Sequence, residues 1–199
     1  MTVLSLQVAA SADDAYQVNT TSSIIGTAHT SDATNEWFGF RWQGVTIAQG
    51  STITEAILSV NINSGTLDDP DHTFYGEAAD NAAEFTADAS NISDRPRTTA
   101  TVVWQSLDLG VTGGDFAAVP DVKTLVQEII DRAGWASGNA LVIVCHGSAD
   151  VNRDLALNMY DSSAAFGATL VITYTAPAAV PDGGTARAGS LFQQWQSGF

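Results

Sequence analysis

Basic residues are scarce in this chain. The 199 residues include 7 Lys and Arg but 22 Asp and Glu, which gives a formal net charge of −15. Proteins that bind nucleic acids or anionic membranes neutralise phosphates with basic patches, so this balance argues against both kinds of partner. The same charge favours solubility.

Cysteine and long apolar runs are also nearly absent. Cys145 is the only cysteine, so no intrachain disulfide can form. No segment approaches the roughly 18 apolar residues that a membrane-spanning helix needs. Residues 1–8 contain no Lys or Arg and alternate polar with apolar side chains, which is typical of a strand rather than a signal peptide. We therefore expect a chain made in a cytoplasm without an export signal.

The patterns of common catalytic and zinc sites are missing. Cys145 and His146 are neighbours on a predicted strand, so their side chains point to opposite faces and cannot act as nucleophile and base. His29 and His72 have no zinc-site spacing relative to His146 or to each other. We expect no enzyme activity and no bound cofactor.

Calcium is the one metal that the acidic residues suggest. Asp13, Asp14, Glu77 and Asp80 are weak candidates, because loop carboxylates can collect a hard cation. Carboxylates on a solvated surface are the simpler interpretation of the same four residues, and we favour it.

Strands dominate what the sequence does contain. Residues 36–42 alternate clearly, with Phe38, Phe40 and Trp42 on one face. The predicted strands cover residues 2–8, 36–42, 53–62, 72–79, 99–105, 140–146, 155–160 and 168–175. Turn-forming clusters separate them, so the pattern predicts an all-β, antiparallel β-sandwich in one domain, residues 1–175.

One short amphipathic helix interrupts the strands. Pro120 and Asp121 are a start signal, and Gly134 follows the last turn as a stop signal. The apolar residues between them recur at helical spacing: Val122, Leu125, Val126, Ile129 and Ile130. We expect this helix to plug one end of the sandwich; a partner-binding helix is the less favoured alternative.

The last 24 residues differ from the 175 before them. Residues 176–199 contain two prolines and four glycines, which prevent a stable helix or a central strand. They end in four large apolar side chains that a solvated tail should not carry: Leu191, Phe192, Trp195 and Phe199. We predict an extended C-terminal arm that docks onto a partner through these four residues.

Two arginines lie close together ahead of a predicted strand that ends in Trp104. Arg95 and Arg97 have acidic neighbours, so we expect them to form ion pairs or to stack on aromatic side chains. Ligand recognition by these arginines is the secondary interpretation.

Several blocks of the chain resemble a known group of β-sandwich domains. The similar segments are residues 38–53, 75–85, 91–104, 126–141 and 160–174. They resemble domains of bacterial extracellular and phage-encoded proteins that are described as DNRLRE-like or carbohydrate-binding-module-like. The resemblance spans roughly residues 5–175 and is most specific at Gly-Trp-Ala-Ser-Gly-Asn, residues 134–139. It implies a jelly-roll-type fold and a non-catalytic, exterior role, and it transfers no active site.

We expect the chain to depart from that group in two ways, by having no export signal and by ending in the aromatic arm. Phage proteins assemble in the host cytoplasm, reach the outside by lysis and commonly attach through extended arms. We therefore predict a phage virion structural protein on the particle exterior: a capsid decoration or cement protein first, a tail or fibre component second. Its expected partners are capsid or other virion subunits, and the symmetry of a capsid implies a homo-oligomer.

A carbohydrate-binding module or adhesin is the alternative function. That function requires exposed, coplanar aromatic rings, and Trp37, Trp42 and Tyr75 are the candidate residues for stacking on a glycan. The two functions are compatible, because a decoration domain can also help a particle adhere to host polymers.

Overall fold

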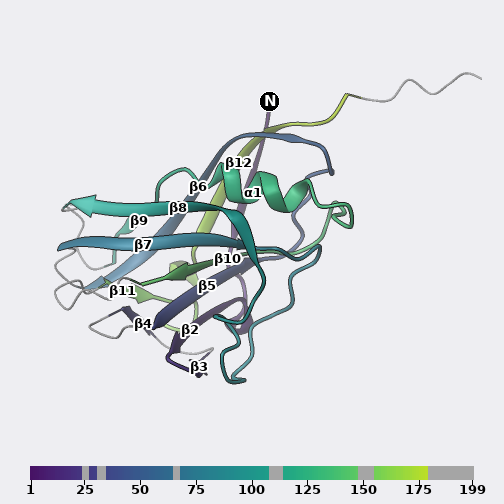
Figure 1. Cartoon of the computed structure of the whole chain (residues 1–199). Coiled ribbons are helices and arrows are strands. Elements are labelled where there is room, and N and C mark those ends of the chain that lie inside the picture. Colours follow the sequence, from purple (N-terminus) through teal and green to yellow (C-terminus); the bar gives the residue numbers. More distant parts are fainter. Residues whose placement is uncertain (24–26, 31–34, 65–67, 108–113, 148–154, 179–199) are drawn as a thin grey trace, which may run out of the picture.

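The fold is known from a computed structural model that describes residues 1–23, 27–30, 35–64, 68–107, 114–147 and 155–178. Two antiparallel sheets pack face to face (Figure 1). Sheet A contains, in spatial order, β1 (Thr2–Gln7), β12 (Thr169–Thr175), β6 (Thr52–Ser64), β11 (Leu155–Asn158) and β4 (Thr27–Thr30), and β9 (Phe116–Ala118) also pairs with β6. Sheet B contains β3 (Thr21–Ser23), β2 (Asp14–Val18), β5 (Glu36–Trp42), β10 (Leu141–His146), β7 (Asp68–Glu77) and β8 (Arg97–Leu107).

The predicted antiparallel β-sandwich is confirmed, and each predicted strand corresponds to a strand of the structure. Four strands were not predicted: β2, β3, β4 and β9. Each spans three to five residues, which is too short for a convincing alternation of polar and apolar side chains. The jelly-roll connection pattern stays a prediction.

The core lies between the two sheets. Strand alternation directs Phe38, Phe40 and Trp42 of β5 inward, where they meet Leu58 and Val60 of β6 within one buried cluster. Two short 3-10 turns, Ser11–Asp13 and Ala164–Phe166, precede β2 and β12. Burial of this apolar surface is the main favourable contribution to folding.

Helix α1 (Lys123–Ile130) closes the side of the sandwich where β6 and β8 lie (Figure 1). Its apolar residues are buried, as the helical spacing predicts. The Gln127 carboxamide oxygen accepts the Ile53 N–H of β6 at 2.8 Å, and the Glu128 carboxylate accepts two consecutive N–H groups of β8. The helix therefore covers the edge strand β8 of sheet B and the part of β6 that pairs with β12 alone. No helix in the described part of the chain is long and apolar enough to cross a membrane.

A long loop covers part of the outer face of sheet B. We call residues 78–96 the covering loop; its buried Ala82, Phe85 and Ile92 pack on β2, β5 and β10. A Cβ atom at Gly39 of β5 would lie 2.5 Å from the Phe85 ring, so only glycine lets the loop approach the strand this closely. At this part of sheet B the molecule therefore has three layers: the covering loop, sheet B and sheet A.

Candidate functional site

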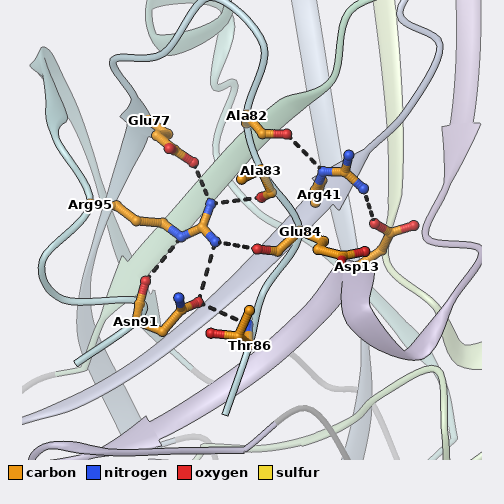
Figure 2. Close-up of polar contacts among 9 residues, drawn as sticks. All are labelled: Asp13, Arg41, Glu77, Ala82, Ala83, Glu84, Thr86, Asn91 and Arg95. Atoms are coloured by element: carbon orange, nitrogen blue, oxygen red, sulfur yellow. Dashed lines mark hydrogen bonds and ion pairs between the residues drawn. The ribbon is translucent and has the colours of Figure 1, made fainter. Parts of the chain in front are cut away.

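Arg95 holds the covering loop together. Figure 2 shows its guanidinium group surrounded by acceptors from the loop and from the end of β7. All five N–H donors are used: Glu77 Oε2 at 2.6 Å, Ala83 O at 2.9 Å, Glu84 O at 2.8 Å, Asn91 O at 3.0 Å and Asn91 Oδ1 at 3.3 Å. The Asn91 carboxamide oxygen also accepts the Thr86 N–H, which links two turns of the loop.

The same guanidinium lies over the Phe85 ring, with its carbon 4.2 Å from the ring centroid. Arg95 thus forms an ion pair and stacks on an aromatic side chain, so the prediction for this residue is confirmed. Both Arg95 and Glu77 are buried, and their charges compensate each other away from water. The role of this pair is to shape the loop.

The four calcium candidates lie in four different environments. Asp13 accepts hydrogen bonds from Arg41 and Gln43, and Asp80 pairs with Arg132. Glu77 pairs with Arg95, and Asp14 accepts the Tyr160 N–H. No three His, Cys, Asp or Glu side chains in the described residues are arranged to hold a metal ion. The structure therefore does not bring the candidates together.

The Asp14 carboxyl group is buried and only partly hydrogen-bonded within the described residues. Its Oδ2 accepts the Tyr160 N–H at 2.8 Å, but its buried Oδ1 has no hydrogen-bond partner within the described residues. Burial raises the pKa of Asp14 from 3.8 to about 7, and the charges of Asp161 and Asp13 add to the rise while the Tyr160 N–H opposes it. Asp14 therefore holds its proton well above the range of an ordinary aspartate.

An aromatic cluster, formed by Trp37, Tyr75 and His146, lies on the outer face of sheet B beside the covering loop. The His146 ring stacks on Trp37 with 4.3 Å between centroids, and Tyr75 lies 6.2 Å from Trp37. The Arg97 guanidinium lies over both rings, 4.8 Å from the Trp37 centroid and 5.4 Å from that of Tyr75. Burial and the Arg97 charge lower the pKa of His146, so its imidazole is neutral at pH 7.

Arg97 is unlike the other basic side chains of the described segments. Arg41, Arg95, Lys123 and Arg132 each pair with a carboxylate. Arg97 is exposed and rests on aromatic rings, and no described carboxylate pairs with it. Its stacking confirms the prediction for this residue, and ligand recognition, the second interpretation, stays a prediction.

The three candidate glycan-stacking residues differ in how much of their surface is exposed. The prediction that Trp42 is exposed is wrong: it is 1% exposed, and its indole N–H donates to Ala168 O in the core. The prediction that Trp37 is exposed is also wrong: it is 5% exposed, because Arg97 and His146 cover a ring that the sequence placed on a polar face. Tyr75 is half-buried and keeps part of its surface accessible.

The side chains of the cysteine and of the described histidines do not form a common site. Cys145 is buried in the core, where burial raises the pKa of its thiol, and its neighbour His146 lies on the opposite face of sheet B. His72 lies in the core near the Phe38 and Trp104 rings. The side chain of His29 and the arm residues Leu191, Phe192, Trp195 and Phe199 lie outside the described residues.

An open depression of about 440 Å³ lies along α1. Its lining consists of Thr124, Gln127, Glu128, Asp131 and Arg132. Gln127 and Glu128 already bind the backbones of β6 and β8, so these polar groups of the depression serve the fold.

Sequence reasoning missed His146 as a member of the aromatic cluster. The pairing of β10 with β5 sets His146 opposite Trp37, and this register is not written in either segment alone. The chain matches no protein-family model, and no curated protein matches it significantly. The DNRLRE-like and carbohydrate-binding-module-like resemblance therefore stays a prediction.

Proposed function

We propose that this chain is a structural protein of a phage virion, a capsid decoration or cement subunit that attaches through its C-terminal arm. The observation that carries the proposal is the place where the arm begins. β12 ends at Thr175 after pairing with both β1 and β6, and the domain has already filled its core at that point. The four large apolar side chains of residues 191–199 come after this completed core in the sequence.

The energetics of the arm support attachment to a partner. Burial of each large apolar side chain contributes about 1.5–3 kcal/mol, before the cost of ordering the arm and of association. Together the four contribute about 6–12 kcal/mol, which is of the same order as the roughly 4–15 kcal/mol that association costs. The net charge of −15 supports a position on the exterior, because a subunit inside a capsid faces packaged nucleic acid.

The test compares arm variants during particle assembly. Mass spectrometry should detect the unchanged chain in particles purified from the source. The combined change Leu191→Ser, Phe192→Ser, Trp195→Ser and Phe199→Ser should leave the protein folded but remove it from gradient-purified particles. Val103→Ser, which truncates an exposed apolar side chain of β8, is the matched control and should be incorporated normally. Full incorporation of the arm variant would contradict the proposal.

Carbohydrate binding is a second candidate function, favoured by Tyr75 and Arg97. A partly accessible tyrosine ring beside a guanidinium that no described carboxylate pairs offers a stacking surface and several hydrogen-bond donors. We expect glycan binding to quench the fluorescence of Trp37, which lies under Arg97. Tyr75→Ala and Arg97→Ala should each abolish this signal, while a glycan array without any binder would remove the candidate.

A further inference from the structure

Two carboxyl groups fasten a surface turn, residues 160–163, to the start of sheet B. The turn follows β11, and Tyr160 at its beginning donates its N–H to Asp14 Oδ2 at 2.8 Å. The next residue, Asp161, is exposed and accepts the Ser11 hydroxyl at 2.7 Å. The two contacts join segments that lie 146 and 150 residues apart in the sequence. They hold the turn against the first 3-10 turn and the first residue of β2.

The Asp14 end of this fastening is cut off from water. Asp14 is 1% exposed, and its buried Oδ1 has no hydrogen-bond partner within the described residues. An ionised carboxylate in such a place loses its hydration without a compensating donor, whereas a protonated carboxyl group loses much less. The closed position of the 160–163 turn therefore favours the neutral form of Asp14.

The charged groups near Asp14 add to this preference. Burial is the main reason that the pKa of Asp14 is raised, and the acidic Asp161 of the turn and Asp13 of the 3-10 turn raise it further. Arg41 of β5 pairs with Asp13, and the β5 residue opposite Asp14 is the uncharged Phe40. Ionisation would therefore place a buried negative charge beside two acidic neighbours.

We propose that Asp14 makes the 160–163 turn a pH-sensitive element, which is closed while Asp14 is protonated and opens increasingly as this carboxyl group ionises. Opening breaks the contact with the Tyr160 N–H, brings Asp14 into water and separates it from Asp161. In the open form Asp14 ionises as an ordinary aspartate does. The open population therefore rises with pH between 3.8, the ordinary pKa of an aspartate, and about 7, the pKa of buried Asp14. The proposal concerns motion within the domain and does not depend on the virion function.

Amide hydrogen exchange of the full chain, followed by NMR, tests the opening of the turn. The protection factor of the Tyr160 amide should fall about tenfold for each pH unit between about pH 5 and about pH 7, and become constant above that range. It should also stay at least about tenfold below the protection factors of β12 amides at every pH. The reason is that β12 lies between β1 and β6, so its amides exchange only when the sheet opens.

Three variants separate the proton from the fastening. Asp14→Asn keeps an oxygen for the Tyr160 N–H but cannot ionise, so the protection of Tyr160 should lose its pH dependence. Ser11→Ala removes the hydrogen bond to Asp161, so the protection of Tyr160 should fall by a similar factor at every pH and keep its slope. Asp94→Asn, at an exposed position of the covering loop, is the control and should change neither.

Three results would overturn the proposal. Equal protection of Tyr160 and of the β12 amides would mean that the Tyr160 amide exchanges only when the whole domain unfolds. A protection factor of Tyr160 that does not change with pH would mean that the charge of Asp14 does not control the turn. A pH dependence that persists in Asp14→Asn would assign the control to another group.

Discussion

At the scale of single residues, Asp14 links the stability of the fold to pH. An ordinary aspartate loses its proton near pH 3.8, but burial raises the pKa of this one to about 7. Between these two values the unfolded chain has released a proton that the folded chain still holds. The free energy of unfolding therefore falls as pH rises from about 4 to about 7, by roughly 4 kcal/mol, and changes no further above that range.

Asp14→Asn tests this linkage, since it keeps an oxygen for the Tyr160 N–H and removes the ionisation. We expect the difference in the free energy of unfolding between the variant and the unchanged protein to shift by roughly 4 kcal/mol in favour of the variant as pH rises from about 4 to about 8. Urea unfolding at several pH values measures this difference. Asp94→Asn, at an exposed position, is the control and should show a constant difference. A constant difference for Asp14→Asn as well would show that the carboxyl is not buried in solution.

At the scale of elements, the covering loop depends on a single guanidinium. Arg95→Lys keeps the charge beside Glu77 but leaves carbonyl oxygens of Ala83 and Glu84 without their donors. We expect a loss of roughly 2–4 kcal/mol in the free energy of unfolding, measured by urea denaturation, because the groups left without partners are partly buried. Arg97→Lys changes only an exposed stacking contact and should cost about 1 kcal/mol or less. Equal losses in the two variants would contradict this role of Arg95.

Helix α1 shows how one short element completes two sheets. Glu128 accepts the Thr99 and Ala100 N–H groups of β8, while Gln127 binds the backbone of β6 on the other side. A Cβ atom at Gly76 of β7 would lie 2.7 Å from Ile129, so glycine lets the helix sit directly on the strand. Capped edges of this kind protect a sandwich from pairing with strands of other chains.

At the scale of the whole molecule, the two outer faces differ. The covering loop and Arg97 shield part of sheet B, and ion pairs occupy most of the described basic side chains. Sheet A carries almost no charge on its strands and exposes Val3 and Phe116. The two sheets therefore differ in charge: the strands of sheet A contain one charged residue, Glu55, and those of sheet B contain eight.

The sequence alone determined the class of fold. The alternation of Phe38, Phe40 and Trp42 predicted their strand, and the spacing of Leu125, Val126 and Ile129 predicted the helix. Both were predictable because local periodicity decides which side of an element can be buried. The kinds of side chain that Arg95 and Arg97 contact were also predictable, since the chain has few basic residues and many acidic and aromatic ones.

Only the tertiary structure decided which outward residues stay exposed. Trp37 lies on the outer face of its strand as its position predicts, yet His146 and Arg97 cover it, and both come from distant segments. Asp14 is the first residue of β2, where strand pairing sets it opposite Phe40 of the core, and nothing local signals that its carboxyl group becomes buried there. Burial on an outer face depends on strand register and on an irregular loop, and neither has a periodic signal in the sequence.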